Sequence, residues 1–100
     1  MIRIRRPSEQ TLAVLAALAS RREDWTYGRE IAGLTGLKSG SLYPILQRLD
    51  ERGLLESRWL EPAVPGRPAR HAYRLTGAGR EALAVARANA SPFRLQEAPR

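Results

Sequence analysis

Hydrogen-bonding and cationic side chains are concentrated between residues 38 and 48 of this chain. Hydroxyls and cations bond phosphate oxygens, glutamine can bond adenine through two hydrogen bonds, and arginine can bond guanine in the same way. The segment is therefore suited to contacting a polynucleotide, with ordinary solvated surface residues as the alternative. The candidate contacts in this segment are Lys38, Ser39, Ser41, Tyr43, Gln47 and Arg48.

A second basic segment lies between residues 61 and 70. It contains three prolines, which stiffen it, together with Gly66, Arg67 and Arg70. The arginine of a basic hairpin loop can enter a narrow minor groove or bond a phosphate. Arg67 and Arg70 are therefore further candidate contacts with nucleic acid.

The N-terminal part of the chain offers two other candidates. Tyr27 and the amide of Gly28 begin an expected helix, and the positive end of a helix can hold a phosphate. A core position is the alternative for Tyr27. Residues 1–7 form a basic arm that either follows DNA or frays in solvent, and its cations are Arg3, Arg5 and Arg6.

The chain contains few residues that could catalyse a reaction or bind a metal. His71 is the only histidine and there is no cysteine, which excludes thiolate chemistry, disulfides and Cys/His metal sites. Asp50 and Glu51 are flanked by arginines, which favours solvated ion pairs over a catalytic carboxylate pair. We therefore expect no enzyme and no cofactor, with His71 as a surface residue of the hairpin.

Length and charge point to a small domain whose partner is nucleic acid. A chain of 100 residues has room for one domain and one modest core. Lys and Arg total 17 against 10 Asp and Glu, and the formal net charge of +7 makes nucleic acid a natural partner.

The N-terminal twenty residues imitate a secretory signal, because a basic stretch is followed by an apolar run over residues 12–19. The run is short, and the polar residues 8–11 separate it from the basic stretch. No stretch approaches the roughly 20 apolar residues of a membrane span. We therefore expect a cytoplasmic protein without a membrane partner.

Capping residues and apolar spacing predict three helices in the first half of the chain. Ser8 caps a helix that continues to about Arg22, and Thr26 caps a short helix over residues 27–35. Ser39 or Ser41 caps a third helix that runs to Arg52. A helix, a short turn containing glycine and another helix form the helix-turn-helix arrangement.

The third helix has two distinct faces. Leu42, Ile45, Leu46 and Leu49 fall within a narrow arc and predict a buried face. The opposite face carries small or polar residues in its N-terminal half, as a helix needs in order to approach bases in a major groove.

The second half of the chain predicts a hairpin and a last helix. Alternation over residues 55–60 and 73–75 indicates two strands, and the basic loop between them is then a wing. Thr76 caps a helix from Gly77 to about Ala90, which we expect to end before Pro92, with residues 91–100 as a flexible tail. The fold class is mainly α with a small β-hairpin, a winged helix-turn-helix domain over residues 8–90.

The first helix is apolar all round in its middle, so it must be covered on more than one side. A partner chain can supply that cover, and alanine tolerated at the surface is the alternative. The last helix also presents a face of small residues. We expect a homodimer on a roughly palindromic operator. The expected interface residues are Leu12, Val14, Leu15, Leu18, Ala82, Val85 and Ala86.

The chain contains the motifs YGREI at 27–31, LKSGSLYPIL at 37–46, GRP at 66–68 and YRLT at 73–76 followed by Gly79. Together these motifs resemble the PadR-like family of transcriptional regulators. The resemblance covers about residues 8–90 and implies a winged helix, a homodimer joined by the first and last helices, and repression relieved by small molecules. The chain departs from many relatives after the hairpin, where only a short segment precedes Pro92.

The resemblance also bears on the two tryptophans, because relatives can hold flat aromatic effectors between tryptophan side chains. Trp25 and Trp59 are therefore either core residues or a site for a small aromatic effector. The function implied overall is a sequence-specific regulator, a repressor, on double-stranded DNA. The alternatives are a winged helix that binds only protein and a binder of single strands or RNA, for which Tyr43 is the only suitable stacking residue.

Overall fold

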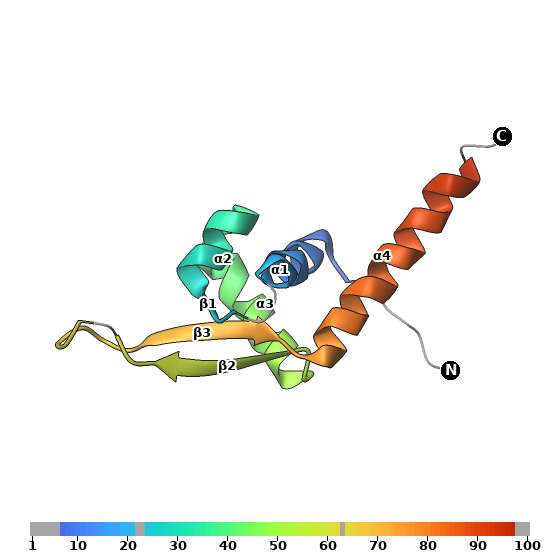
Figure 1. Cartoon of the computed structure of the whole chain (residues 1–100). Coiled ribbons are helices and arrows are strands. Elements are labelled where there is room, and N and C mark those ends of the chain that lie inside the picture. Colours follow the sequence, from blue (N-terminus) through green and yellow to red (C-terminus); the bar gives the residue numbers. More distant parts are fainter. Residues whose placement is uncertain (1–6, 22–23, 63, 98–100) are drawn as a thin grey trace.

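The chain folds into four helices and a three-stranded sheet in the computed structural model (Figure 1), which describes residues 7–21, 24–62 and 64–97, with side chains described up to residue 89. The elements in chain order are α1 (Glu9–Ser20), β1 (Thr26–Tyr27), α2 (Gly28–Thr35), α3 (Ser39–Glu51), β2 (Leu55–Leu60), β3 (Arg70–Leu75) and α4 (Gly77–Glu97).

The predicted helix-turn-helix is present as α2 and α3. Gly36 ends α2 with a φ of 77°, and its amide donates to the carbonyl of Ala32 at 2.8 Å. Glycine suits this position because it adopts the left-handed conformation without a Cβ clash. The caps differ from those predicted. The N-cap of α2 is Tyr27 rather than Thr26, and that of α3 is Lys38 rather than Ser39 or Ser41.

The sheet contains one strand that the alternation pattern did not predict. Its order is β1-β3-β2, and both pairings are antiparallel. Thr26 lies in β1 opposite Tyr73, is fully buried, and donates from its hydroxyl to the carbonyl of Asp24 at 3.3 Å. Thr26 is therefore part of the sheet, which explains why it does not cap α2. A strand of two residues is too short to show alternation.

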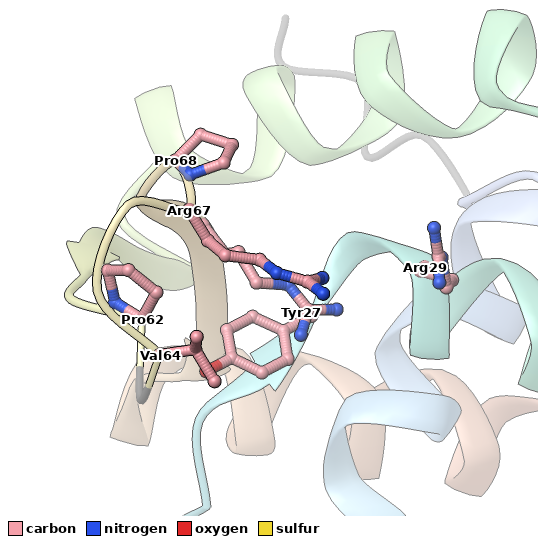
Figure 2. Close-up of a pocket in the computed structure, with 7 residues that line it drawn as sticks. Tyr27, Arg29, Pro62, Val64, Arg67 and Pro68 are labelled. Carbon is pink, nitrogen blue, oxygen red and sulfur yellow. The ribbon is translucent and has the colours of Figure 1, made fainter.

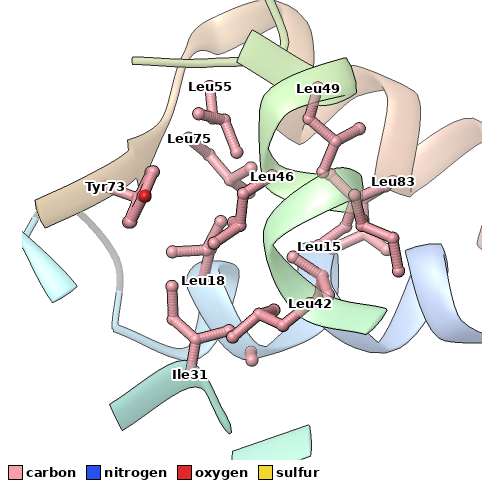
Figure 3. Close-up of a cluster of buried hydrophobic side chains, with 13 residues drawn as sticks. Leu15, Leu18, Ile31, Leu42, Leu46, Leu49, Leu55, Tyr73, Leu75 and Leu83 are labelled. Atoms are coloured by element: carbon pink, nitrogen blue, oxygen red, sulfur yellow. The ribbon is translucent and has the colours of Figure 1, made fainter. Parts of the chain in front are cut away.

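The core is built around α1, which contacts α2, α3, α4 and β3. Val14, Leu15 and Leu18 are each at most 1% exposed. Figure 3 shows Leu15 and Leu18 among side chains from the other elements. The apolar character of α1 thus follows from burial inside one chain, so the prediction that these three residues form a dimer interface is wrong. The rest of the labelled cluster is Ile31, Leu42, Leu46, Leu49, Leu55, Tyr73, Leu75 and Leu83.

Thr76 caps α4 as predicted, because its Oγ accepts from the amide of Gly79 at 3.0 Å. The same hydroxyl donates to the carbonyl of Gly53 at 2.7 Å. The predicted helix end is wrong, since α4 continues through Pro92 to Glu97. A proline removes one backbone hydrogen bond, and a helix of good helix-forming residues can continue past it with a kink. Ser8 caps α1 as expected, but α1 ends at Ser20, and Arg22 lies outside the described residues.

The start of α4 lies against the turn between α3 and β2. A Cβ built on Gly79 collides with the carbonyl oxygen of Leu54 and lies 3.0 Å from a methyl group of Leu75. Only glycine allows this approach. By contrast, Gly33 in α2 has no neighbour within 4 Å of such a Cβ.

These two helical glycines predict opposite changes in stability. Gly33→Ala should raise the free energy of unfolding by roughly 0.5–1 kcal/mol, because alanine loses less backbone entropy on folding. Gly79→Ala should lower it by about 1–3 kcal/mol, because the backbone of Leu54 must move. Urea unfolding of both variants at one protein concentration measures the difference. Equal shifts in the same direction would show that the close approach at Gly79 is not a constraint.

Candidate nucleic-acid interface

The side of α3 that faces away from the core forms a polar surface, here called the reading face. Lys38, Ser39, Ser41, Gln47 and Arg48 are all exposed there, as predicted. The predicted apolar face, Leu42, Ile45, Leu46 and Leu49, is buried. With one apolar face and one polar face, the helix can pack on one side and contact a groove on the other.

Small residues on the reading face allow a partner to approach the backbone of α3 closely. Gly40 and Pro44 are both exposed on it. Pro44 lies beyond the first turn of α3, because the amide of Leu42 already donates to the carbonyl of Lys38 at 2.9 Å. Proline has no amide hydrogen, so the Gly40 carbonyl loses its helical partner and can accept from outside the helix.

The wing consists of the loop over residues 61–69 and the adjoining ends of β2 and β3. Gly66 turns the loop with a φ of 90°. The loop faces α2 across a cleft of about 460 Å³. Figure 2 shows Arg67 reaching from the loop toward Tyr27, with Arg29 of α2 on the other side. The residues that line this wing cleft are Tyr27, Arg29, Pro62, Val64, Arg67, Pro68 and Arg70.

Tyr27 acts as a platform for one of the wing arginines. The guanidinium carbon of Arg70 lies 3.9 Å from the centroid of the Tyr27 ring. A cation over the face of an aromatic ring is attracted by the ring quadrupole. Tyr27 is half-buried, and the exposed Arg70 lies against its ring. The ring therefore holds Arg70 at the edge of the cleft, where the cation stays accessible.

The N-terminus of α2 is not the open phosphate site that the sequence suggested. Gly28 is buried, and a Cβ on it would collide with the hydroxyl of Tyr43. Glu30 accepts from the amide of Tyr27 at 3.1 Å and pairs with Arg21 at 2.7 Å. The Glu30 carboxylate therefore already bonds the amide of Tyr27, which is not available to a phosphate.

A second hollow, here called the wing-root hollow, lies between α3 and the base of the wing. Its volume is about 390 Å³, and it shares Arg29 and Arg70 with the wing cleft. Arg29, Trp59 and His71 were not among the predicted contacts, because no sequence spacing shows that α2 and the wing face each other. The lining residues are Gly28, Arg29, Tyr43, Trp59, Arg70, His71 and Tyr73.

The tryptophans occupy neither of the predicted arrangements. Trp59 is 66% exposed, so it is not a core residue. Trp25 is half-buried with Arg74 4.4 Å and Arg58 5.0 Å from its ring centroid. Arg58 and Trp59 are successive residues of β2, so their side chains lie on opposite faces of the sheet. The two indoles of one chain therefore cannot enclose a flat effector between them.

The acidic residues at the end of α3 also differ from expectation. Asp50 accepts from the hydroxyl of Ser57 at 2.9 Å, and Glu51 accepts weakly from Gln47 at 3.4 Å. Within the described residues, neither carboxylate pairs with Arg48 or Arg52. Asp50 therefore ties α3 to β2 instead of forming an ion pair.

The remaining interface residues lie on α1 and α4. Val85 is 53% exposed, whereas Leu12, Ala82 and Ala86 are half-buried. These four residues can still contact another chain, unlike Val14, Leu15 and Leu18. The arginines of the N-terminal arm, Arg3, Arg5 and Arg6, lie outside the described residues.

The helix-turn-helix, the exposed reading face and the adjoining basic wing together define a winged helix-turn-helix DNA-binding domain. The described part of the chain contains no cluster of three His, Cys, Asp or Glu residues able to hold a metal. It also contains no helix that is long and apolar enough to cross a membrane.

Comparison with known proteins assigns this domain to a family. The model of the PadR-like family of transcriptional regulators matches residues 26–85. The chain therefore belongs to the PadR-like family, which makes it a DNA-binding transcriptional regulator and not an enzyme. A comparison with curated protein sequences found no match.

Solved structures agree with this assignment. A PadR-like transcription factor from Bacteroides fragilis is 28% identical with a TM-score of 0.67, and the match covers 88% of this chain and 84% of that one. The protein smu.1704 from Streptococcus mutans UA159 is 25% identical with a TM-score of 0.70, covering 92% and 88%. A PadR family regulator from Clostridium difficile R20291 shares the fold at 23% identity and a TM-score of 0.69, covering 90% and 92%.

The buried ring of Tyr73 predicts a measurable titration. Burial raises the pKa of Tyr73 from 10.0 to about 12, with smaller contributions from Tyr43 and Asp50. The unfolded chain loses this proton first, so stability is unaffected below pH 10 and falls between pH 10 and about 12. Ultraviolet titration should show a phenolate step near pH 12 that Tyr73→Phe removes. A step for this residue at the same pH as in the urea-unfolded chain would contradict the burial.

Proposed function

We propose that this chain is a sequence-specific repressor that binds double-stranded DNA as a homodimer, with α3 in the major groove and the wing on the minor groove or the phosphates. The observation that supports this proposal is the juxtaposition of two surfaces. Tyr43 on α3 and Arg70 on the wing line the same hollow. One duplex can therefore contact the reading face and the wing arginines together.

The charge distribution supports a phosphate partner. The chain carries a net charge of +7. Arg48, Arg67 and Arg70 form no ion pair with any residue that the structure describes, whereas Arg21 and Arg74 pair with Glu30 and Glu56. The unpaired cations lie on α3 and the wing, where they can displace counterions from DNA.

A winged helix that binds only protein is the alternative function, and the fold by itself is compatible with it. The basic wing cleft favours DNA, because an interface with protein does not need cations on both of its sides. A gel-shift assay with genomic fragments separates the two functions, since only the regulator retards DNA.

The proposed dimer uses the exposed part of α4. Val85, with Ala82 and Ala86 beside it, presents an apolar strip with small residues that allow a second helix to approach. A two-fold axis there repeats the reading face, so the operator should be a rough palindrome with half-sites about 10 base pairs apart or a multiple of that.

Two substitutions test the roles of wing and reading face in the same assay. Arg67→Ala should reduce the slope of log K against log salt by about 0.9 for each phosphate that the arginine neutralises, with sequence preference nearly unchanged. Gln47→Ala should lower discrimination between operator and random DNA by about 1–3 kcal/mol, because base-edge contacts carry specificity. Fluorescence anisotropy over a salt series measures both. If Gln47→Ala weakens binding to all sequences equally, Gln47 contacts the backbone instead of a base.

A charge on α4 tests the dimer. Val85→Glu should give a folded monomer with much weaker operator binding, because Val85 is 53% exposed within one chain. Leu18→Glu is the matched comparison and should unfold the chain, because Leu18 is only 1% exposed. Sedimentation and circular dichroism report the two outcomes. A Val85→Glu variant that remains dimeric would place the interface elsewhere.

A further inference from the structure

The base of the wing holds a large aromatic side chain that is both exposed and fixed. The ring of Trp59, 66% exposed, stacks on His71 with centroids 4.5 Å apart and planes 10° apart. The ring of His71 lies 4.7 Å from that of Tyr73, which is only 5% exposed and belongs to the core. The rings of Tyr73, His71 and Trp59 therefore form a continuous series from the core to an accessible indole.

This stack faces α3. Trp59 and Ser57 lie on the same face of β2, and Ser57 donates to Asp50 of α3 at 2.9 Å. His71 is directly opposite Trp59 in the register, and Tyr73 is opposite Ser57. The stack thus extends the core-facing side of the sheet beyond the core and into the wing-root hollow.

Tyr73 also contacts the His71 ring through a hydrogen bond. The Tyr73 hydroxyl and Nδ1 of His71 are 3.1 Å apart. The hydroxyl can donate to Nδ1 or accept from it, depending on which ring nitrogen carries the proton. In the tautomer in which Nδ1 accepts from Tyr73, the ring proton is on Nε2, which is left to donate to an outside acceptor.

The charges around the hollow define the ligand. Arg29 lines it from α2 and supplies a cation, and Tyr43 adds a hydroxyl from α3. A cation, the hydroxyl and imidazole donors and a flat ring match a phosphate diester joined to a sugar. A duplex whose major groove holds α3 and whose next groove meets the wing places one backbone strand between them.

We propose that Trp59 and His71 form a seat for this strand, with the indole against a deoxyribose and Nε2 of His71 donating to the adjoining phosphate. The assignment rests on the proposed DNA binding, and it gives two residues outside the reading face and the wing loop a direct contact. The contact is independent of base sequence, so it strengthens binding to every duplex.

The two tryptophans provide a matched pair of reporters, because Trp25 lies on the opposite face of the sheet. Trp25→Phe leaves Trp59 as the only indole, and Trp59→Phe leaves Trp25. The probe is a mixed-sequence duplex of about 30 base pairs, long enough for two half-sites. DNA should change the emission of the variant that retains Trp59 and leave the variant that retains Trp25 nearly unchanged. Binding without any change in Trp59 emission would overturn the proposal that Trp59 contacts the DNA backbone.

Substitution of His71 tests the hydrogen bond. His71→Phe keeps a ring beneath Trp59 and removes the donor, and it should weaken duplex binding by about tenfold. His71→Gln retains an amide donor and should stay within about threefold of the native affinity. Equal affinity of the His71→Phe variant and the native chain would overturn the role of His71. Anisotropy of the labelled duplex measures DNA binding separately from tryptophan emission. Absence of any DNA binding by the native chain would overturn the proposed function itself.

Discussion

Burial of α1 at the centre of the chain is the constraint on which the other elements depend. A helix that is apolar on all sides is stable only if neighbours cover it, and α2, α3, α4 and β3 do so within a single chain. Since Leu15 and Leu18 contact side chains from both the helix-turn-helix and the sheet, they fix the reading face relative to the wing. The position of the reading face relative to the wing is therefore set by packing on the far side of α3.

Residue patterns predicted the structure correctly where a local rule determines it. The spacing of Leu42, Ile45, Leu46 and Leu49 identified the buried face of α3, and Thr76 identified the start of α4. The patterns failed where the outcome depends on distant neighbours. The exposure of Trp59, the opposing position of Arg29 and the single-chain burial of Val14 all follow from which elements meet, and residue spacing within one segment does not contain that information.

Several cations and donors of the candidate interface are held by aromatic rings. Arg70 lies on Tyr27, Trp59 lies on His71, and His71 bonds Tyr73. Long side chains lose rotamer freedom on binding, which costs roughly 0.5–1.5 kcal/mol each. Rings that restrict these side chains in the free protein lower that cost. The interface is thus prepared before any partner arrives.

The junction at Thr76 has a mechanical consequence. Its hydroxyl donates to Gly53, its amide donates to Leu54 at 3.2 Å, and Gly79 leaves no space beside that carbonyl. The β2–β3 ribbon extends from one side of this junction and α4 from the other (Figure 1). These contacts hold the first turn of α4 against the base of the ribbon. Because α4 and the ribbon meet at Thr76, a change in the direction of α4 is passed to the wing through this junction.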